Sequence, residues 1–178
     1  MESLNDIELV KTAAGGNSEA FTCLVDRHYT LVYRAAYRFC GVKEDAEDIA
    51  QEVFIKLARV IHGFKGESAF TTWLYRIAVN SSHDYLKKNS GKRNMEAKYV
   101  EEKAIAEKEE NSNPISSEEL YLALDKLPAK IKEAVVLVLA EGLSHKEAAL
   151  ALGCAETTVS WRIFQARRKL KTLLKEVA

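Results

Sequence analysis

The chain has 178 residues, enough for one or two small domains, and its 26 basic residues balance its 26 acidic ones. This balance excludes a global positive field, so any affinity for nucleic acid has to come from local clustering of charge. Few glycines and prolines, with long stretches rich in Ala, Leu, Glu and Lys, predict an all-α protein. The amino-terminal sequence lacks the blocks of a secretion signal, and the longest apolar run is too short to span a bilayer. We therefore expect a cytoplasmic protein.

The three cysteines are Cys23, Cys40 and Cys154, which form no close pair and no CxxC motif. Such spacing predicts neither a zinc site nor a disulfide framework. We expect all three to act as small buried hydrophobic residues in a reducing compartment. No other cluster of metal ligands is apparent, so we expect no metal and no cofactor.

The first half of the chain shows the periodicity of four amphipathic helices. A glycine pair stops the first helix, and Asn17 caps the second, which ends at Gly41. A glycine-containing loop at residues 62–68 follows the third helix, and Ser68 is expected to cap the fourth. The expected helices cover residues 7–14, 18–40, 43–61 and 69–88.

The third of these helices carries the sequence DAEDIAQEVF, residues 45–54. Helical spacing brings Asp45 near Asp48 and Asp48 near Glu52, while Ile49 and Val53 face inward. Like charges at this spacing weaken a helix, which favours a basic partner across from them. Attraction of carboxylates to a helix N-terminus is the simpler alternative, but it does not explain Glu52. We expect a protein-docking surface here rather than a catalytic or metal site.

The fourth helix interleaves aromatic residues with cations and small polar residues. This mixture is typical of surfaces that grip single-stranded DNA, where bases stack on rings and cations hold the backbone. Phe70 and Trp73 are more often core residues than stacking platforms. Tyr75 and the polar row Asn80, Asp84 and Lys87 are therefore the candidates for a surface role.

Residues 91–115 differ in character from both flanking regions, being rich in glutamate and poor in large apolar residues. Such a composition predicts a flexible or partly helical acidic linker. Ser116 and Glu119 then form a possible capping box that opens a second domain, residues 116–178. Pro128 suits the start of the next helix, residues 129–141. The run AVVLVLA within it is also compatible with a buried strand, but no partner strand is visible, so we expect a helix.

The last part of the second domain has the pattern of a helix-turn-helix at residues 144–170. Ser144 and Glu147 form a capping box, and Gly153 suits the left-handed turn between the helices. Ala149 and Val159 supply the small and apolar residues at the helix contact. Six cations against two glutamates on the second helix indicate contact with phosphates. A helical hairpin with a solvated basic face is the alternative, but capping, turn, core and charge together favour DNA binding.

The order of these motifs resembles bacterial sigma factors of the extracytoplasmic-function (ECF, group 4) family. The motifs are DAEDIAQEVF, FTTWLYRIAVN, a charged linker and LPAKIKEAVVLVLAEGLSHKEAALALGCAETTVSWRIFQARRKL. The resemblance implies two helical domains, sigma region 2 (residues 1–90) and sigma region 4 (residues 116–178). It implies a subunit that directs core RNA polymerase to promoters, performs no chemistry of its own and is held by an anti-sigma factor. It also implies no membrane contact other than through a membrane-anchored anti-sigma factor.

The resemblance assigns a role to each group of candidate residues. The polymerase clamp would bind Asp45, Glu47, Asp48, Gln51, Glu52 and Phe54, and the flap would lie near Val135, Val138 and Leu139. The downstream (−10) element would be melted and read by Phe64, Lys65, Tyr75, Arg76, Asn80, His83, Asp84, Lys87 and Lys88, with the loop at residues 62–68 capturing a flipped base. The upstream (−35) element would be read by Glu156, Thr157, Thr158, Ser160, Trp161, Arg162, Phe164, Arg167, Arg168 and Lys171.

One departure from the family lies in the second helix of the helix-turn-helix. Many relatives carry a basic residue and a serine where Ser160 and Trp161 stand, and a basic residue at Gln165. An exposed tryptophan reads bases by shape or through thymine methyl groups, so we expect an unusual upstream element.

Two other classes of function are a free-standing repressor and an enzyme. A free-standing repressor would use the helix-turn-helix on a palindromic operator and the first domain for dimerisation. A metal- or thiol-dependent enzyme would need clustered ligands or a nucleophile with a base, and the sequence shows neither. The acidic face and the aromatic fourth helix favour the sigma factor, because a simple repressor needs neither feature.

Overall fold

The computed structural model describes residues 4–100 and 123–177, with side chains for residues 4–89 and 123–172. Within these ranges all regular structure is helical, as the composition predicts. The first domain contains α1 (Asp6–Ala14), α2 (Ser18–Cys40), α3 (Lys43–Val60), the short 3₁₀ turn η1 (Ile61–Gly63) and α4 (Phe70–Val100). The second contains α6 (Ala129–Val135), η2 (Val136–Ala140), α7 (His145–Leu152) and α8 (Glu156–Val177).

The ends of α1 and α2 follow from local sequence signals. The Asn17 side chain accepts a hydrogen bond from the Ala20 amide at 2.8 Å, so α2 begins where the sequence predicts. Gly41 ends α2 with a φ of 76°, a left-handed conformation that costs glycine nothing. At α1, Asn5 and Glu8 form a capping box that the sequence analysis did not single out.

The start of α4 differs from its prediction. The Ser68 hydroxyl donates to the Ala69 carbonyl at 3.3 Å and caps no helix amide, so the expected cap is wrong. The helix begins at Phe70, after Ala69, whose carbonyl accepts the first helical bond from Trp73. Its backbone runs on through Val100, well beyond the expected end at residue 88. The first ten residues of the expected linker are therefore helical, and the remainder lies outside the described residues, as do Ser116 and Glu119.

The helix predicted at residues 129–141 is present, which decides against a strand for the AVVLVLA run. Pro128 lies just before α6 as its N-cap. After Val135 the helix widens into the π-type turn η2, where the Glu141 amide donates to the Val136 carbonyl five residues earlier at 2.9 Å. Gly142 then reverses the chain with a φ of 74°. This widened turn aims Glu141 at the first domain.

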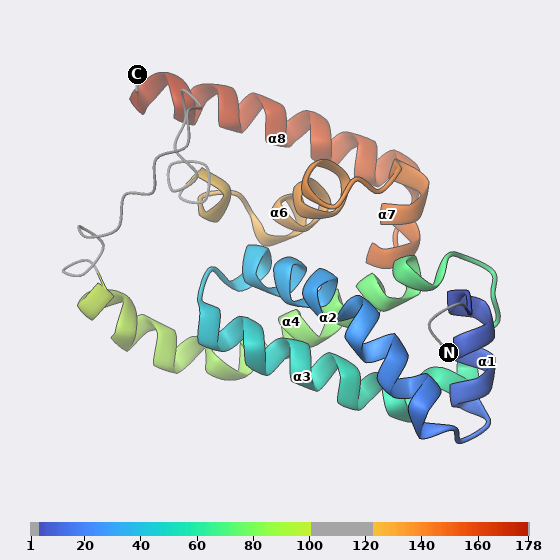
Figure 1. The fold of residues 1–178 in the computed structure, drawn as a ribbon. Coiled ribbons are helices and arrows are strands. Elements are labelled where there is room, and N and C mark those ends of the chain that lie inside the picture. The colour runs from blue at the N-terminus through green and yellow to red at the C-terminus, as the bar shows by residue number, and fades with distance from the viewer. Residues whose placement is uncertain (1–3, 101–122, 178) are drawn as a thin grey trace, which may run out of the picture.

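The first domain is a bundle in which α2, α3 and α4 pack around one apolar core, with α1 across its end (Figure 1). Its fully buried side chains include Leu24, Ile49, Leu57 and Leu74, which the amphipathic spacing places on the inner faces. Cys40 is buried while Cys23 and Cys154 are half-buried, and all three are free thiols.

The second domain packs directly on the first, with α7 against α4 and α6 below α8 (Figure 1). A second apolar cluster spans the boundary and joins Ala35, Phe39, Tyr75 and Val79 of the first domain to the inner faces of α6, α7 and α8. The described parts of the chain thus form a closed arrangement of the two domains, a point on which the sequence offered no expectation.

Candidate nucleic-acid and protein interfaces

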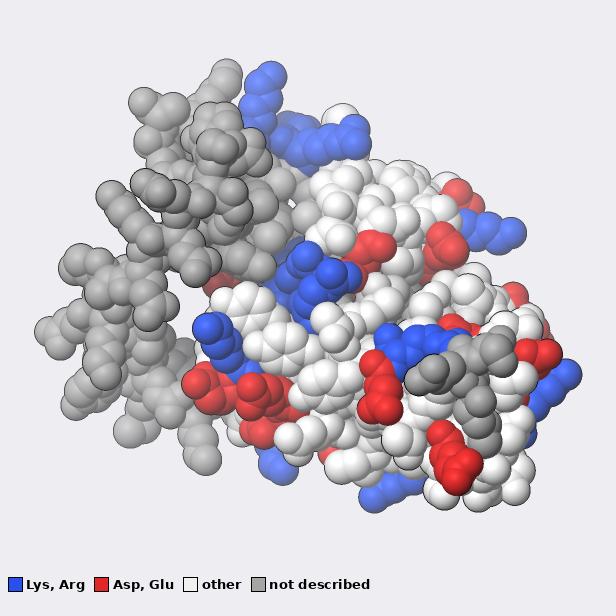
Figure 2. All heavy atoms as spheres, viewed as in Figure 1, with Lys and Arg blue, Asp and Glu red and all other residues white. Residues whose placement is uncertain are grey.

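The acidic face of α3 consists of Asp45, Glu47, Asp48, Gln51 and Glu52, and Figure 2 shows acidic side chains gathered over the first turns of this helix. Four of the five residues are exposed, while Asp45 is half-buried. Ala46, Ile49, Ala50 and Val53 are buried on the opposite face, as predicted.

Tyr85 of α4 reaches across to this acidic face, a contact that the sequence did not reveal. Its hydroxyl donates to Asp45 at 2.9 Å and to Asp48 at 3.0 Å. Partial burial, together with these bonds to two carboxylates, raises the pKa of Tyr85. The hydroxyl therefore stays protonated and relieves part of the repulsion between the two aspartates.

Replacing Tyr85 with phenylalanine is expected to destabilise the first domain by about 1 kcal/mol, because two carboxylates lose a shared donor. Urea unfolding at neutral pH measures this change. Tyr29→Phe is the matched control, since the Tyr29 ring is more exposed and lies against Phe54. Equal effects of the two substitutions would show that the Tyr85 hydroxyl does not support the acidic face.

Phe54 does not belong to the exposed part of this face. Its side chain is only 8% exposed and its ring stacks on that of Tyr29, with centroids 6.1 Å apart. Phe54 lies nine helical residues after Asp45 and therefore on the opposite side of α3. Its contact with the polymerase clamp stays a prediction. Tyr29 also begins a stacked row on α2 with Tyr33 and Tyr37 that the sequence analysis missed, although the four-residue spacing was visible.

On α4, the predicted polar row is exposed to solvent. Asp84 accepts a hydrogen bond from Lys56 at 3.0 Å, which ties α4 to the end of the acidic face. All the residues of α4 predicted to contact the −10 element except Tyr75 are exposed, namely Arg76, Asn80, His83, Asp84, Lys87 and Lys88.

Tyr75, in contrast, is buried, and the prediction of a surface role is wrong for the closed arrangement. Its side chain is 3% exposed, and its hydroxyl donates to Glu141 at 2.7 Å. Burial and this contact raise the pKa of Tyr75, so its hydroxyl remains a donor. The residue was read as exposed because its partner lies 66 positions away in the other domain.

Glu141 is the centre of the polar contact between the domains. Its side chain is 1% exposed, and it forms an ion pair with Arg38 in addition to the bond from Tyr75. Arg34 lies 3.9 Å away and adds a second cation. Removing the carboxylate would leave a partly buried guanidinium and a buried hydroxyl without this partner.

Two further polar contacts join the domains near Glu141. His83 of α4 pairs with the buried Glu133 of α6, and Lys132 donates to the Phe39 carbonyl at 3.1 Å. The second domain therefore covers the α4 surface at Tyr75 and engages His83, which stays exposed, while the row that includes Asn80 and Lys87 remains open.

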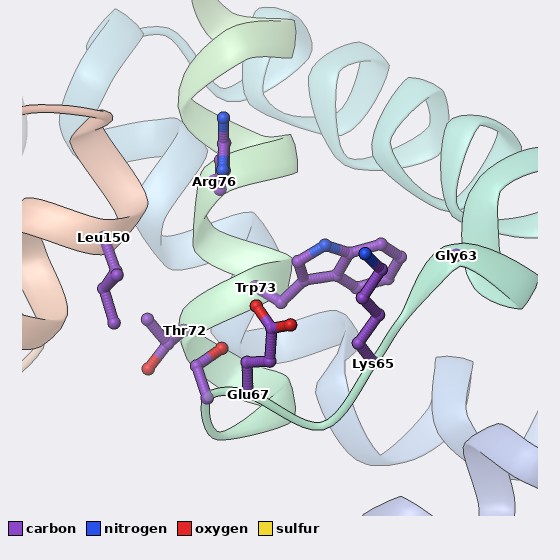
Figure 3. A pocket seen from close by; sticks show the side chains of 8 residues that line it. Gly63, Lys65, Glu67, Thr72, Trp73, Arg76 and Leu150 are labelled. Carbon is purple, nitrogen blue, oxygen red and sulfur yellow. The ribbon is translucent and has the colours of Figure 1, made fainter.

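A cavity of about 260 Å³ lies where the loop after α3 meets α4 and α7. Lys65, Trp73 and Arg76 line it from the first domain, and Leu150 of α7 lies on its other side (Figure 3). Phe64 of the same loop is half-buried with its ring 5.3 Å from that of Trp73. Phe64 therefore supports the cavity wall, whereas Lys65 is exposed at its mouth.

The helix-turn-helix formed by α7 and α8 agrees with its prediction in each local signal. Ser144 and Glu147 form the capping box, with the serine amide 2.8 Å from the carboxylate, and these bonds lower the pKa of Glu147. Gly153 adopts a φ of 63°. Val159 is fully buried, and Ala149 is 6% exposed.

The second helix, α8, presents two opposite faces. Val159, Ile163 and Ala166 are buried, and Leu170 is half-buried against them. Eight of the ten residues predicted to read the −35 element are exposed on the outer face, and Thr158 and Arg162 at its edges are half-buried. The exposed residues are Glu156, Thr157, Ser160, Trp161, Phe164, Arg167, Arg168 and Lys171.

In the described ranges, no cluster of His, Cys, Asp and Glu side chains is arranged to hold a metal ion. No helix within those same ranges is long and apolar enough to cross a membrane.

Comparison with known proteins gives a consistent result along the chain. The family Sigma-70 region 2 matches residues 24–92, and the family Sigma-70, region 4 matches residues 117–170. The ECF RNA polymerase sigma-E factor of Haemophilus influenzae is 36% identical over 182 residues, covering 96% of this chain and 95% of the relative. The sigma-E factor of Escherichia coli K12 is 36% identical over 180 residues, covering 95% and 94%.

Two solved structures share the fold over nearly the full length. CnrH, solved in complex with the cytosolic domain of CnrY, matches with a TM-score of 0.73 and 29% identity, over 97% of this chain and 99% of that one. The sigma factor RpoE of Bartonella quintana, solved with the anti-sigma factor NepR, matches with a TM-score of 0.66 over 87% and 96%, and at 24% identity it supports the fold alone.

Two helical domains that match sigma region 2 and sigma region 4 define a two-domain transcription initiation factor. The chain belongs to the ECF sigma factors of RNA polymerase. Its function is to direct core RNA polymerase to specific promoters, which decides against the free-standing repressor.

Proposed function

We propose that the chain divides promoter recognition between its two domains and performs no chemistry itself. Residues 1–90 bind the polymerase clamp and the −10 element, and residues 116–178 bind the −35 element, with 91–115 as connector. The observation that carries this proposal is the presence of the exposed acidic face and of the basic outer face of α8 on one chain. The protein acts in the cytoplasm, where RNA polymerase initiates transcription.

The acidic face of α3 is the proposed contact with the clamp. Glu47, Asp48 and Glu52 are exposed and project from a rigid helix whose other side is fully packed. A basic partner would relieve the repulsion that these carboxylates exert on one another. Leu139, which is 53% exposed just before Glu141, and the half-buried Val138 offer an apolar contact for the flap.

The open row of α4 is the proposed contact with the −10 element. Arg76, Lys87 and Lys88 supply cations for phosphates, and Asn80 supplies an amide for a base edge. The cavity between Lys65, Trp73 and Arg76 lies next to this row and has an aromatic wall, which suits capture of a flipped base.

The closed arrangement buries one of the proposed −10 residues, Tyr75, and ties a second, the exposed His83, to Glu133 of the second domain. Full engagement of the −10 element therefore requires the second domain to leave α4. In the polymerase complex we expect the contacts of Glu141 and Glu133 to be replaced by contacts with polymerase and DNA, because each domain then occupies its own promoter element.

An anti-sigma factor is the proposed regulator. The relative CnrH was solved with a cytosolic domain of another protein bound to it, and its likeness to this chain extends over both domains. A partner that holds the two domains together would keep the α4 surface covered. A membrane-anchored anti-sigma factor of this kind would provide the only membrane contact that we propose.

Charge reversal on the acidic face tests the clamp contact. The double substitution Asp48→Lys with Glu52→Lys is expected to weaken binding to core polymerase roughly 100-fold, because attraction to a basic partner becomes repulsion. Binding is measured by titrating labelled protein with core polymerase at fixed salt.

The control for this experiment is Glu19→Lys with Asp26→Lys, which makes the same charge change at exposed positions of α2. We expect the control to bind core polymerase within about twofold of the original protein. Equal loss in both variants would trace the effect to net charge, and no loss in either would remove the acidic face from the polymerase contact.

A further inference from the structure

Two large aromatic side chains of α8, Trp161 and Phe164, point away from the protein. They are 56% and 57% exposed, whereas Val159 and Ile163 on the same helix are buried. Their spacing of three residues places them on one stripe, directly opposite the buried stripe of α8. The two rings therefore form an apolar surface on the face of the recognition helix that meets DNA in a helix-turn-helix.

Two neighbouring polar side chains on this face, Ser160 and Arg168, are already engaged. The Ser160 hydroxyl lies 2.8 Å from Nδ1 of His145 and donates to the Glu156 carbonyl at 3.2 Å. These contacts fix α8 against the start of α7. Arg168 holds its guanidinium 5.9 Å from the Phe164 ring centroid, so one side of that ring faces a cation. The indole of Trp161 is therefore the large apolar group on this face that is available to a binding partner.

The surrounding charge indicates which partner that is. Between residues 156 and 172, α8 carries a single acidic residue, Glu156, and five Lys or Arg residues. Arg167, Arg168 and Lys171 are exposed around the aromatic pair. An apolar surface within a ring of cations fits a DNA groove, whose walls are phosphates, better than it fits a protein surface of mixed charge.

The major groove offers one apolar group on a base edge, the 5-methyl group of thymine. We propose that Trp161 contacts the methyl group of a thymine in the upstream promoter element and makes that thymine a requirement of recognition. This inference rests on the proposed function, in which α8 reads the upstream element. It adds that one residue, Trp161, recognises one base through an apolar contact in the major groove.

The experiment uses the holoenzyme formed from core polymerase and the full chain. A promoter library with a randomised upstream element is first selected by run-off transcription. Each thymine of the selected element is then replaced singly by deoxyuridine, which removes only the methyl group and keeps base pairing. We expect one position at which deoxyuridine weakens promoter binding roughly 3- to 10-fold.

The same DNA pair is then tested with Trp161→Ala. This variant is expected to bind the thymine promoter as weakly as the original protein binds the deoxyuridine promoter, and to lose discrimination between them. Ile7→Ala is the control, since Ile7 is a similarly exposed apolar residue on α1, at 50% exposure. The control should retain full discrimination.

Three results would overturn the inference while leaving the proposed function intact. They are a selected element without thymine, deoxyuridine substitution without effect on the original protein, and unchanged discrimination in Trp161→Ala. An equal loss on both DNAs in Trp161→Ala would also overturn it, by assigning the indole to a protein or backbone contact. Absence of any holoenzyme-dependent transcript would instead contradict the proposed function.

Discussion

Replacing Glu141 with alanine is expected to open the closed arrangement of the two domains. The substitution removes a carboxylate that is 1% exposed and that pairs with Arg38 and accepts a bond from Tyr75. Breaking such a buried pair costs about 3 kcal/mol, which raises the open fraction on the order of 100-fold. Hydroxyl-radical footprinting measures the change as faster oxidation of Phe39 and Tyr75, which are buried only while the domains are together.

Leu74 provides the internal reference for this experiment, because it is fully buried within the first domain whether or not the second domain is docked. Glu156→Ala is the control variant, since it removes an exposed carboxylate from α8. Oxidation of Phe39 and Tyr75 that stays unchanged in Glu141→Ala would show that the apolar cluster alone holds the domains together. Faster oxidation of Leu74 would indicate unfolding of the first domain rather than opening.

Replacing Leu57 with alanine is expected to destabilise the first domain by about 3 kcal/mol. Leu57 is fully buried between α3 and its neighbours, so the substitution leaves a cavity in addition to losing buried apolar area. Urea unfolding followed by circular dichroism measures the change in the free energy of unfolding.

The matched control is Ile55→Ala on the same helix, because Ile55 is 48% exposed. We expect this control to change stability by less than about 0.5 kcal/mol. If the two substitutions cost the same, the packing described for α3 is incorrect. A large difference with both variants still folded would confirm the inner and outer faces of the helix that carries the acidic face.

The helix-turn-helix was predictable because each of its signals is local. The Ser144–Glu147 capping box and the left-handed Gly153 act within a few residues, and the buried stripe of α8 follows from helical spacing. The same holds for the cap at Asn17 and the end of α2 at Gly41. Such signals act within a few residues and do not depend on the rest of the chain.

The closed arrangement could not be predicted, because the contacts that hold it join residues far apart in the sequence. Tyr75 and Glu141 are separated by 66 positions, and neither residue type by itself indicates a partner in another domain. The widened turn η2, which directs Glu141 toward α4, has no sequence signature that distinguishes it from an ordinary helix end. Tyr85 was missed as well, because its contact with the acidic face joins two separate helices.

Two expectations about α4 were wrong, one at each end of the helix. Ser68 was read as a cap because serine often caps helices, but α4 begins one residue later than this reading requires. The fourth helix was expected to end at residue 88, although the residues after Gly91 favour helix and the backbone continues through Val100. The helix propensity of these residues together outweighs the low propensity of the single Gly91.

Run-off transcription with core RNA polymerase is the most direct test of the central claim that this chain selects promoters for the enzyme. Purified core polymerase is assayed with and without the chain on a promoter library. We predict start sites that appear only when the chain is present and that vanish with the Asp48→Lys, Glu52→Lys variant. The opposite result, no chain-dependent start site together with tight binding of the chain alone to a palindromic duplex, would contradict the account.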